Sequence, residues 1–192
     1  MAWGMSEVSA SSWGIIGLGR IGSKLAEVGR ALGAEINYYK PQRKTEPEEK
    51  QLGVNFRGFK ELLTTSDVII ICVPLTEKTR RLIGAREIEM MKPGAILINA
   101  ARGGIVDDAA VAAALAAGHL GGAGLDTFES EPLPADHPLL TLPEEVKDRI
   151  FFTPHLGGVT VQALNRMIDA ALNNCIRVIK GERPLAVVNG VE

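Results

Sequence analysis

The sequence has few cysteines, no excess of charge of either sign and no long hydrophobic run. Two cysteines, Cys72 and Cys175, cannot form the disulfide framework of a small secreted domain. The formal net charge of −2 provides no basic field that would attract nucleic acid or an anionic membrane. We therefore expect a protein of a reducing, cytoplasmic compartment that binds neither nucleic acid nor a membrane.

Membrane spans, signal peptides and metal sites also lack support in the sequence. The longest apolar run, at 68–75, is far shorter than the roughly 20 residues that cross a bilayer. The start, MAWGMSEVSASS, has no charged segment followed by an apolar stretch, as a secretory signal would. No metal-ligand spacing of His and Cys is present, so we expect no metal site. The composition, 46% hydrophobic and 23% charged over 192 residues, is that of an ordinary globular chain.

Short apolar runs alternate with helical patterns along the chain. The runs lie at 13–18, 35–39, 68–73, 95–99, 121–125 and 150–153, the helical patterns at 21–32, 58–64, 85–91 and 107–117, and a short edge strand is expected at 54–56. This alternation predicts βαβ units and a mostly parallel sheet that is covered on both faces. The stretch at 129–146, rich in Pro and acidic residues, is expected to be a long loop with a functional role.

A glycine pattern lies where the first predicted strand gives way to a helix. Gly17, Gly19 and Gly22 have GxGxxG spacing, and they permit a tight turn, close approach of a pyrophosphate and close helix–strand packing. The amides of Arg20, Ile21 and Gly22, together with the helix dipole, would attract the anion. The alternative is a glycine turn without a ligand. The context favours a dinucleotide-binding domain with a Rossmann-type, doubly wound parallel sheet.

The residue after the second predicted strand bears on which dinucleotide is bound. An acidic residue there accepts hydrogen bonds from the ribose 2′-OH of NAD, but this sequence has Lys40, with Arg43 nearby. A lysine cannot accept those bonds, whereas it can neutralise a 2′-phosphate. Because Glu46, Glu48 and Glu49 follow, a solvated loop is the alternative. We predict that NADP is favoured over NAD, with Lys40 and Arg43 among the cofactor contacts.

Charged side chains follow the last three apolar runs. Arg102 follows the fourth run, Asp126, Glu129 and Glu131 follow the fifth, and His155 follows the sixth. Ligands of open α/β sheets bind at the carboxyl ends of the strands, so these residues should share one edge with the glycine loop. Arginine grips a carboxylate with two hydrogen bonds, and histidine transfers a proton near neutrality. Beside a nicotinamide, the set suits interconversion of a 2-keto acid and a 2-hydroxy acid.

Five segments of the sequence resemble the D-isomer-specific 2-hydroxyacid dehydrogenase family. They are GIIGLGRIG, DVIIICVPLT, MKPGAILINAARGGIVD, GLDTFESEPLP and FTPHLGG. The tract YYKPQRKTEPEE is most similar to members that act on glyoxylate and hydroxypyruvate, several of them NADP-linked. The resemblance implies an NAD(P)-dependent oxidoreductase that transfers a hydride between the nicotinamide cofactor and a 2-keto or 2-hydroxy acid.

The resemblance also implies which residues form the site. Arg102, Glu131 and His155 match the catalytic residues, and Glu131 is preferred to Glu129 because a proline follows it. Further cofactor contacts are implied at Arg20, Ile21, Val73, Pro74, Ala101, Asp126, His155 and Gly157. Of these, Asp126 would lie near the nicotinamide carboxamide.

Family members carry a substrate domain built mostly from a segment that precedes the glycine loop. We therefore divide the chain into a start at 1–12 that resembles nothing in the family, a dinucleotide-binding domain at 13–160, and a C-terminal helix and tail at 161–192. In the family, that helix returns to the substrate domain. Two alternatives to an active enzyme stay open, namely a dinucleotide-binding interaction module and a truncated, catalytically incompetent member.

The C-terminal helix is expected to present an apolar stripe. Leu164, Ile168, Leu172, Ile176 and Ile179 recur at helical spacing, and the stripe must be covered by the chain's own sheet, a second domain or a second subunit. Family members also form dimers through the cofactor domain. We predict a homodimer, because exposed stripes of this kind usually mark interfaces.

Overall fold

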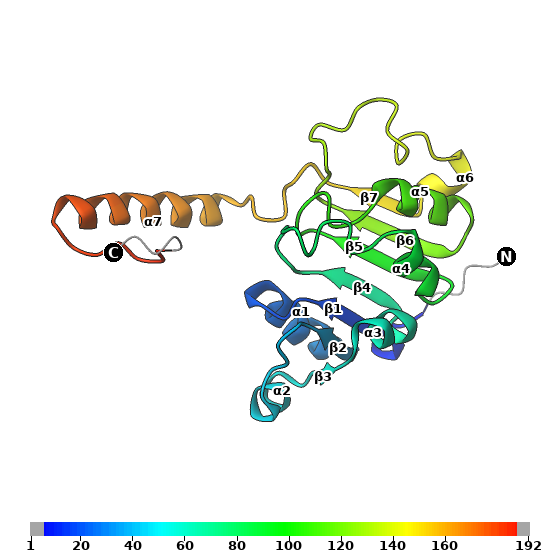
Figure 1. Cartoon of the computed structure of the whole chain (residues 1–192), viewed down its shortest axis with the longest axis horizontal. Coiled ribbons are helices and arrows are strands. Elements are labelled where there is room, and N and C mark those ends of the chain that lie inside the picture. The colour runs from blue at the N-terminus through cyan, green and yellow to red at the C-terminus, as the bar shows by residue number, and fades with distance from the viewer. Residues whose placement is uncertain (1–5, 188–192) are drawn as a thin grey trace. The chain divides into compact units, whose positions relative to one another are not determined.

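The computed structural model describes residues 6–187 and contains a seven-stranded sheet (Figure 1). The strands are β1 (Ser12–Ile16), β2 (Glu35–Tyr39), β3 (Asn55–Phe56), β4 (Val68–Ile71), β5 (Ala95–Asn99), β6 (Leu120–Leu125) and β7 (Ile150–Phe152). Their order is β3-β2-β1-β4-β5-β6-β7, and every neighbouring pair is parallel. The predicted Rossmann-type, doubly wound sheet is confirmed, with β3 as its edge strand.

Helices connect the strands and follow the last one. They are a 3₁₀ helix η1 (Val8–Ala10), α1 (Arg20–Ala31), α2 (Glu46–Leu52), α3 (Phe59–Thr65), α4 (Ala85–Met90), α5 (Asp108–Ala116), α6 (Glu144–Lys147) and α7 (Val161–Ile179). The chain forms two compact units, Met1–Pro154 with the sheet and His155–Glu192 with α7. None of the helices between residues 6 and 187 has the length and apolarity that crossing a bilayer requires.

The two faces of the sheet bury separate cores, as the alternation along β4 shows. Ile69 and Ile71 are buried in the core under α3, α4 and α5, whereas Ile70 joins the smaller core under α1. Successive strand residues point to opposite faces, so a continuous apolar strand requires cover on both. On the α1 side of the sheet the helical cover does not reach β7, where Phe151 is 74% exposed. The second half of the sheet therefore presents an apolar face within the first unit.

Helix α2 occupies a segment that the sequence analysis considered as a solvated loop. Thr45 begins it with a capping box, in which the Glu48 side chain accepts hydrogen bonds from the Thr45 backbone N–H at 2.9 Å and from its hydroxyl at 2.8 Å. Pro47 fits the first turn, and Gly53 ends the helix in the left-handed conformation, with φ of 65°. The short helix α6 likewise lies near the end of the expected long loop.

Candidate functional site

The glycine loop joins β1 to α1 beside the point where the strand order reverses, between β1 and β4. An added Cβ at Gly17, whose φ is +99°, would lie 2.6 Å from the Cys72 carbonyl oxygen. At Gly22 it would lie 2.3 Å from the Gly17 carbonyl oxygen. A Cβ at Gly19 would meet no protein atom within 4 Å. Packing thus forbids a side chain at Gly17 and Gly22, whereas Gly19 borders open space.

The first turn of α1 faces this open space without a side-chain cap. Gly19 is the N-cap residue and has no side chain that could accept the hydrogen bonds of the first helical amides. Arg20 and Ile21 open the helix, and both are exposed. Uncapped amides and the positive end of the helix dipole bind a phosphate group well. The residues present therefore fit the pyrophosphate of a dinucleotide.

An apolar cavity of about 670 Å³ lies along the α1 side of β1, β4 and β5 and reaches the segments that follow β4 and β5. It is lined by Trp13, Ile21, Leu25, Val68, Ile70, Ile71, Cys72, Val73, Pro74, Leu75, Ile98, Ala100, Ala101 and Arg102. The structure thus brings together five residues predicted from the sequence: Ile21, Val73, Pro74, Ala101 and Arg102. The volume of the cavity lies in the range of pockets that hold small ligands and cofactors.

Asn99 fixes the turn that carries Arg102. Its buried side chain accepts a hydrogen bond from the Ala101 backbone N–H at 3.1 Å and donates one to the Arg102 carbonyl oxygen at 3.0 Å. The Arg102 side chain is exposed and donates to the Ala101 carbonyl oxygen at 2.6 Å. Asn99 was not among the residues predicted from the sequence, although an amide residue at the end of an otherwise apolar strand was a signal for it.

Asp126 lies immediately after β6 and is only 7% exposed. Its backbone N–H donates to the Asn99 carbonyl oxygen at 3.0 Å, and its carboxylate accepts a hydrogen bond from the Thr153 hydroxyl at 2.5 Å. Thr153 follows β7, so this bond joins the carboxyl ends of two neighbouring strands. Thr153 is a second positioning residue that the sequence analysis did not identify.

Glu131 and Glu129 lie in the loop after β6 and have different partners. The Glu131 carboxylate accepts a hydrogen bond from the Phe128 backbone N–H at 2.9 Å. The Glu129 carboxylate pairs with Arg80 at 3.2 Å. This loop packs directly on the turn of Arg102, because a Cβ at Gly103 would lie 1.9 Å from the Phe128 carbonyl oxygen. Gly103 thus allows the segments of Arg102 and Glu131 to approach.

His155 and Gly157 belong to the second compact unit, which His155 opens. His155 follows β7 by a few residues, is exposed, and has a left-handed backbone with φ of 56°. The turn continues to Thr160, whose side chain accepts a hydrogen bond from the Ala163 backbone N–H at 3.0 Å and so caps α7. No residue of α7 is buried.

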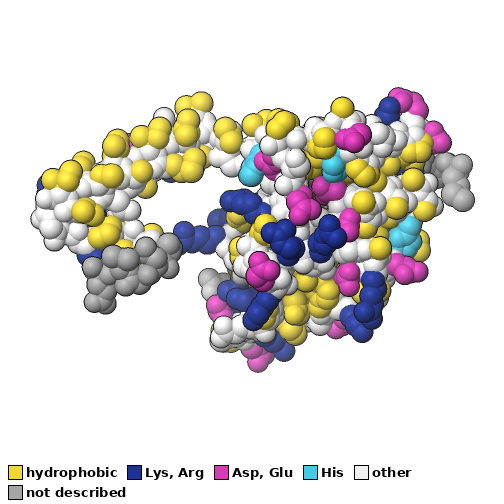
Figure 2. Space-filling view, turned by 45° about the horizontal axis from the view of Figure 1, so that its top comes forward, with side chains coloured by type: hydrophobic (Ala, Val, Ile, Leu, Met, Phe, Trp, Pro, Cys, Tyr) yellow, Lys and Arg dark blue, Asp and Glu magenta, His cyan; other side chains and the backbone are white. Residues whose placement is uncertain are grey.

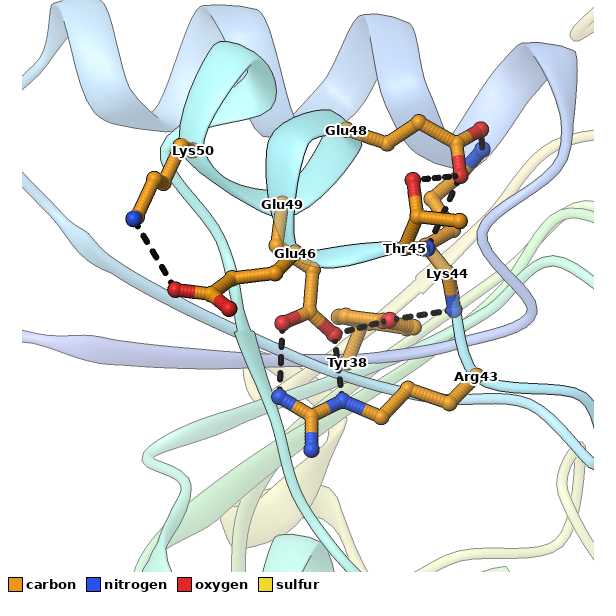
Figure 3. Close-up of polar contacts among 8 residues, drawn as sticks. All are labelled: Tyr38, Arg43, Lys44, Thr45, Glu46, Glu48, Glu49 and Lys50. Atoms are coloured by element: carbon orange, nitrogen blue, oxygen red, sulfur yellow. Dashed lines mark hydrogen bonds and ion pairs between the residues drawn. The ribbon is translucent and has the colours of Figure 1, made fainter.

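A polar network follows β2, where the sequence analysis expected contacts to the cofactor (Figure 3). The Glu49 carboxylate accepts hydrogen bonds from Arg43 Nε at 2.8 Å, from Arg43 Nη2 at 2.7 Å and from the Tyr38 hydroxyl at 2.6 Å. Tyr38 in turn accepts one from the Lys44 backbone N–H at 2.9 Å. Hydrogen bonds from Arg43 and Tyr38 lower the pKa of Glu49 to about 2, and burial raises the pKa of Tyr38 to about 12.

A parallel sheet with an uncapped, glycine-lined helix N-terminus at its switch point defines a dinucleotide-binding domain of the Rossmann type. Residues 2–157 match the family model of the D-isomer specific 2-hydroxyacid dehydrogenase, NAD binding domain. The chain belongs to this family.

Several relatives are similar over almost the whole chain. Glyoxylate reductase of Aeropyrum pernix is 42% identical over 183 residues, which are 95% of this chain and 53% of that protein. D-3-phosphoglycerate dehydrogenase of Bacillus subtilis is 40% identical over 184 residues, 96% of this chain and 34% of that protein. The chain spans about half the length of the glyoxylate reductases that it matches.

Solved structures agree with this relationship. The glyoxylate reductase from Paecilomyes thermophila superposes with a TM-score of 0.82 at 34% identity, covering 93% of this chain and 52% of that one. The D-lactate dehydrogenase with NAD⁺ from Lactobacillus jensenii gives a TM-score of 0.83 at 32% identity, covering 96% and 57%.

Proposed function

We propose that this chain is the cofactor-binding part of an NAD(P)-dependent oxidoreductase that interconverts a 2-keto acid and a 2-hydroxy acid of the glyoxylate or hydroxypyruvate type. The observation that carries this proposal is the cavity at the switch point, where Ile21, Val73 and Ala101 line the same space as Arg102. An apolar pocket with a charged group at one end suits a nicotinamide beside a small carboxylic acid. The names of the relatives support the choice of substrate class.

The residues divide the chemistry among them. A bound reduced nicotinamide supplies the hydride. Arg102 holds the substrate carboxylate with two parallel hydrogen bonds and polarises the keto group. His155 donates a proton to the keto oxygen as it becomes a hydroxyl, and Glu131 orients the imidazole. Asp126, held by Thr153, would bind the nicotinamide carboxamide.

We infer that NADP is the preferred cofactor. Lys40 directly follows β2, and the Gly17 backbone N–H donates to the Tyr39 carbonyl oxygen at 2.8 Å, so the glycine loop and the start of the Lys40 segment are in contact. A cation at this position favours the 2′-phosphate.

The free thiols of Cys72 and Cys175 support a reducing, cytoplasmic compartment.

Turnover by the purified chain tests the proposed reaction. With NADPH and glyoxylate or hydroxypyruvate, we expect loss of nicotinamide absorbance. Arg102→Ala should lower kcat/KM about 100-fold or more, because the substrate carboxylate and keto group lose their main cationic partner. Arg86→Ala, which removes an exposed arginine on α4, is the matched control and should leave the rate unchanged. If folded chain that binds NADPH shows no turnover, the chain is an interaction module or an incompetent member of the family.

We further infer that two copies associate into a homodimer. The stripe on α7 is exposed, with Leu172 at 57% and Ile179 at 84%, and Figure 2 shows hydrophobic side chains along this helix. Exposed apolar stripes of this kind usually mark interfaces, and Phe151 on the sheet is a further exposed apolar side chain. We expect light scattering at micromolar concentration to give the mass of a dimer. The 20.5 kDa mass of a single chain would contradict this inference.

A further inference from the structure

The loop after β2 is rich in cations, but carboxylates of α2 neutralise most of its positive charge (Figure 3). Of the loop's cations, Arg43 pairs with Glu49 at 2.7 Å and Lys44 with Glu48 at 3.0 Å, while Lys50 of α2 itself pairs with Glu46 at 2.9 Å. Within residues 6–187, Lys40 makes no ion pair, and it is partly buried. Lys40 is thus the cation of this loop whose charge is not compensated by α2.

The Arg43 side chain is 58% exposed, but the carboxylate that pairs with it is buried and held by several hydrogen bonds. Glu49 is buried to 7% exposure, and its carboxylate grips the guanidinium through two nitrogens in the bidentate geometry that suits arginine. The guanidinium also lies over the Phe56 ring, with Cζ 5.2 Å from the ring centroid. A fully buried Tyr38 hydroxyl completes the shell of Glu49. Turning Arg43 toward a phosphate would leave a buried carboxylate without its cation, which is costly.

From this arrangement we infer that Glu49 withholds Arg43 from the cofactor, so that Lys40 alone distinguishes NADP from NAD. Glu49 is then a positioning residue that sets the strength of cofactor discrimination without contacting the dinucleotide. The inference rests on the proposed NADP preference, and it revises the expectation that Arg43 binds the cofactor. Arginine is a better phosphate ligand than lysine, so release of Arg43 from Glu49 should strengthen binding of the 2′-phosphate.

Dissociation constants for NADPH and NADH, measured by nicotinamide fluorescence with the purified chain, test this inference. Lys40→Met should raise the Kd for NADPH about tenfold, which corresponds to about 1.4 kcal/mol, and leave the Kd for NADH unchanged. The double variant Arg43→Met with Glu49→Gln removes both members of the pair. It should keep the wild-type ratio of the two constants within about twofold.

The single variant Glu49→Gln should change the Kd for NADPH in the direction opposite to that expected of structural damage. Because it frees Arg43, we expect the Kd for NADPH to fall about threefold while the Kd for NADH stays constant, and the gain should vanish when Arg43→Met is added. A melting curve confirms that each variant is folded. With the fold confirmed in this way, weaker binding of NADPH by Glu49→Gln counts against the inference.

Two results would overturn the inference. One is a double variant that loses discrimination as completely as Lys40→Met, because Arg43 would then contact the phosphate. The other is Glu49→Gln with unchanged or weaker NADPH binding. Failure of the proposed cofactor preference looks different: the wild-type chain would bind NADH as tightly as NADPH, while the gain on Glu49→Gln would still report whether Arg43 is withheld.

Discussion

Replacing Gly103 with alanine should destabilise the protein and separate the two segments that carry Arg102 and Glu131. The new Cβ would lie 1.9 Å from the Phe128 carbonyl oxygen and 2.5 Å from the Glu129 backbone nitrogen. Both obstacles are backbone atoms, so no side-chain rotation relieves the clash. Overpacking of this kind costs about 1–3 kcal/mol, and we expect the melting temperature to fall by about 5 °C.

Gly124→Ala is the matched control for this change. Gly124 lies in β6, and an added Cβ would be 3.8 Å from the nearest atom of Ile98, which is ordinary contact. Its melting temperature should remain within about 2 °C of the wild type, because surroundings that already accommodate a methyl group need not shift. Equal melting temperatures for Gly103→Ala and Gly124→Ala would contradict the close packing of the two loops described above.

Replacing Gly19 with alanine should abolish most dinucleotide binding and leave the fold intact. A Cβ at this position meets no protein atom within 4 Å, so the change has no steric cost in the free protein. The same space is where we expect the pyrophosphate to approach the first amides of α1. We expect the Kd for NADPH to rise at least tenfold, equivalent to about 1.4 kcal/mol, in a fluorescence titration.

Gly58→Ala controls for the intrinsic effect of alanine at a helix N-cap. Gly58 is the N-cap of α3, and its added Cβ also meets nothing within 4 Å. The loss of N-cap preference on changing glycine to alanine applies to both variants, so their melting temperatures should shift alike. Only Gly19→Ala should lose binding. A Kd for NADPH that stays at the wild-type value in Gly19→Ala would remove the glycine loop from the cofactor site.

Local sequence patterns predicted most of the secondary structure because their causes are local. The Asp107 side chain accepts hydrogen bonds from the Ala109 and Ala110 backbone N–H groups, and it starts α5 where the helical pattern at 107–117 begins. The missed helix α2 had an equally local signal, since Thr45 and Glu48 have the spacing of a capping box. Its high density of glutamate made a solvated loop the alternative reading, although those carboxylates pair with neighbouring cations.

The order of the strands in the sheet determines which residues from distant segments contact one another. The bond between Asp126 and Thr153, and the packing of Gly103 on Phe128, join segments whose proximity depends on the order of the strands. No periodicity in the sequence encodes such a pairing.

Spacing along the chain was enough to predict the strand–helix alternation, the glycine loop and the set of residue types at the strand ends. Long-range packing placed Thr153 against Asp126 and buried the Glu49 carboxylate that pairs with Arg43, and spacing along the chain specifies neither. The sequence shows which cations and anions are present. Which of them meet is set by the packing that brings a buried carboxylate within hydrogen-bond distance of one guanidinium and not another.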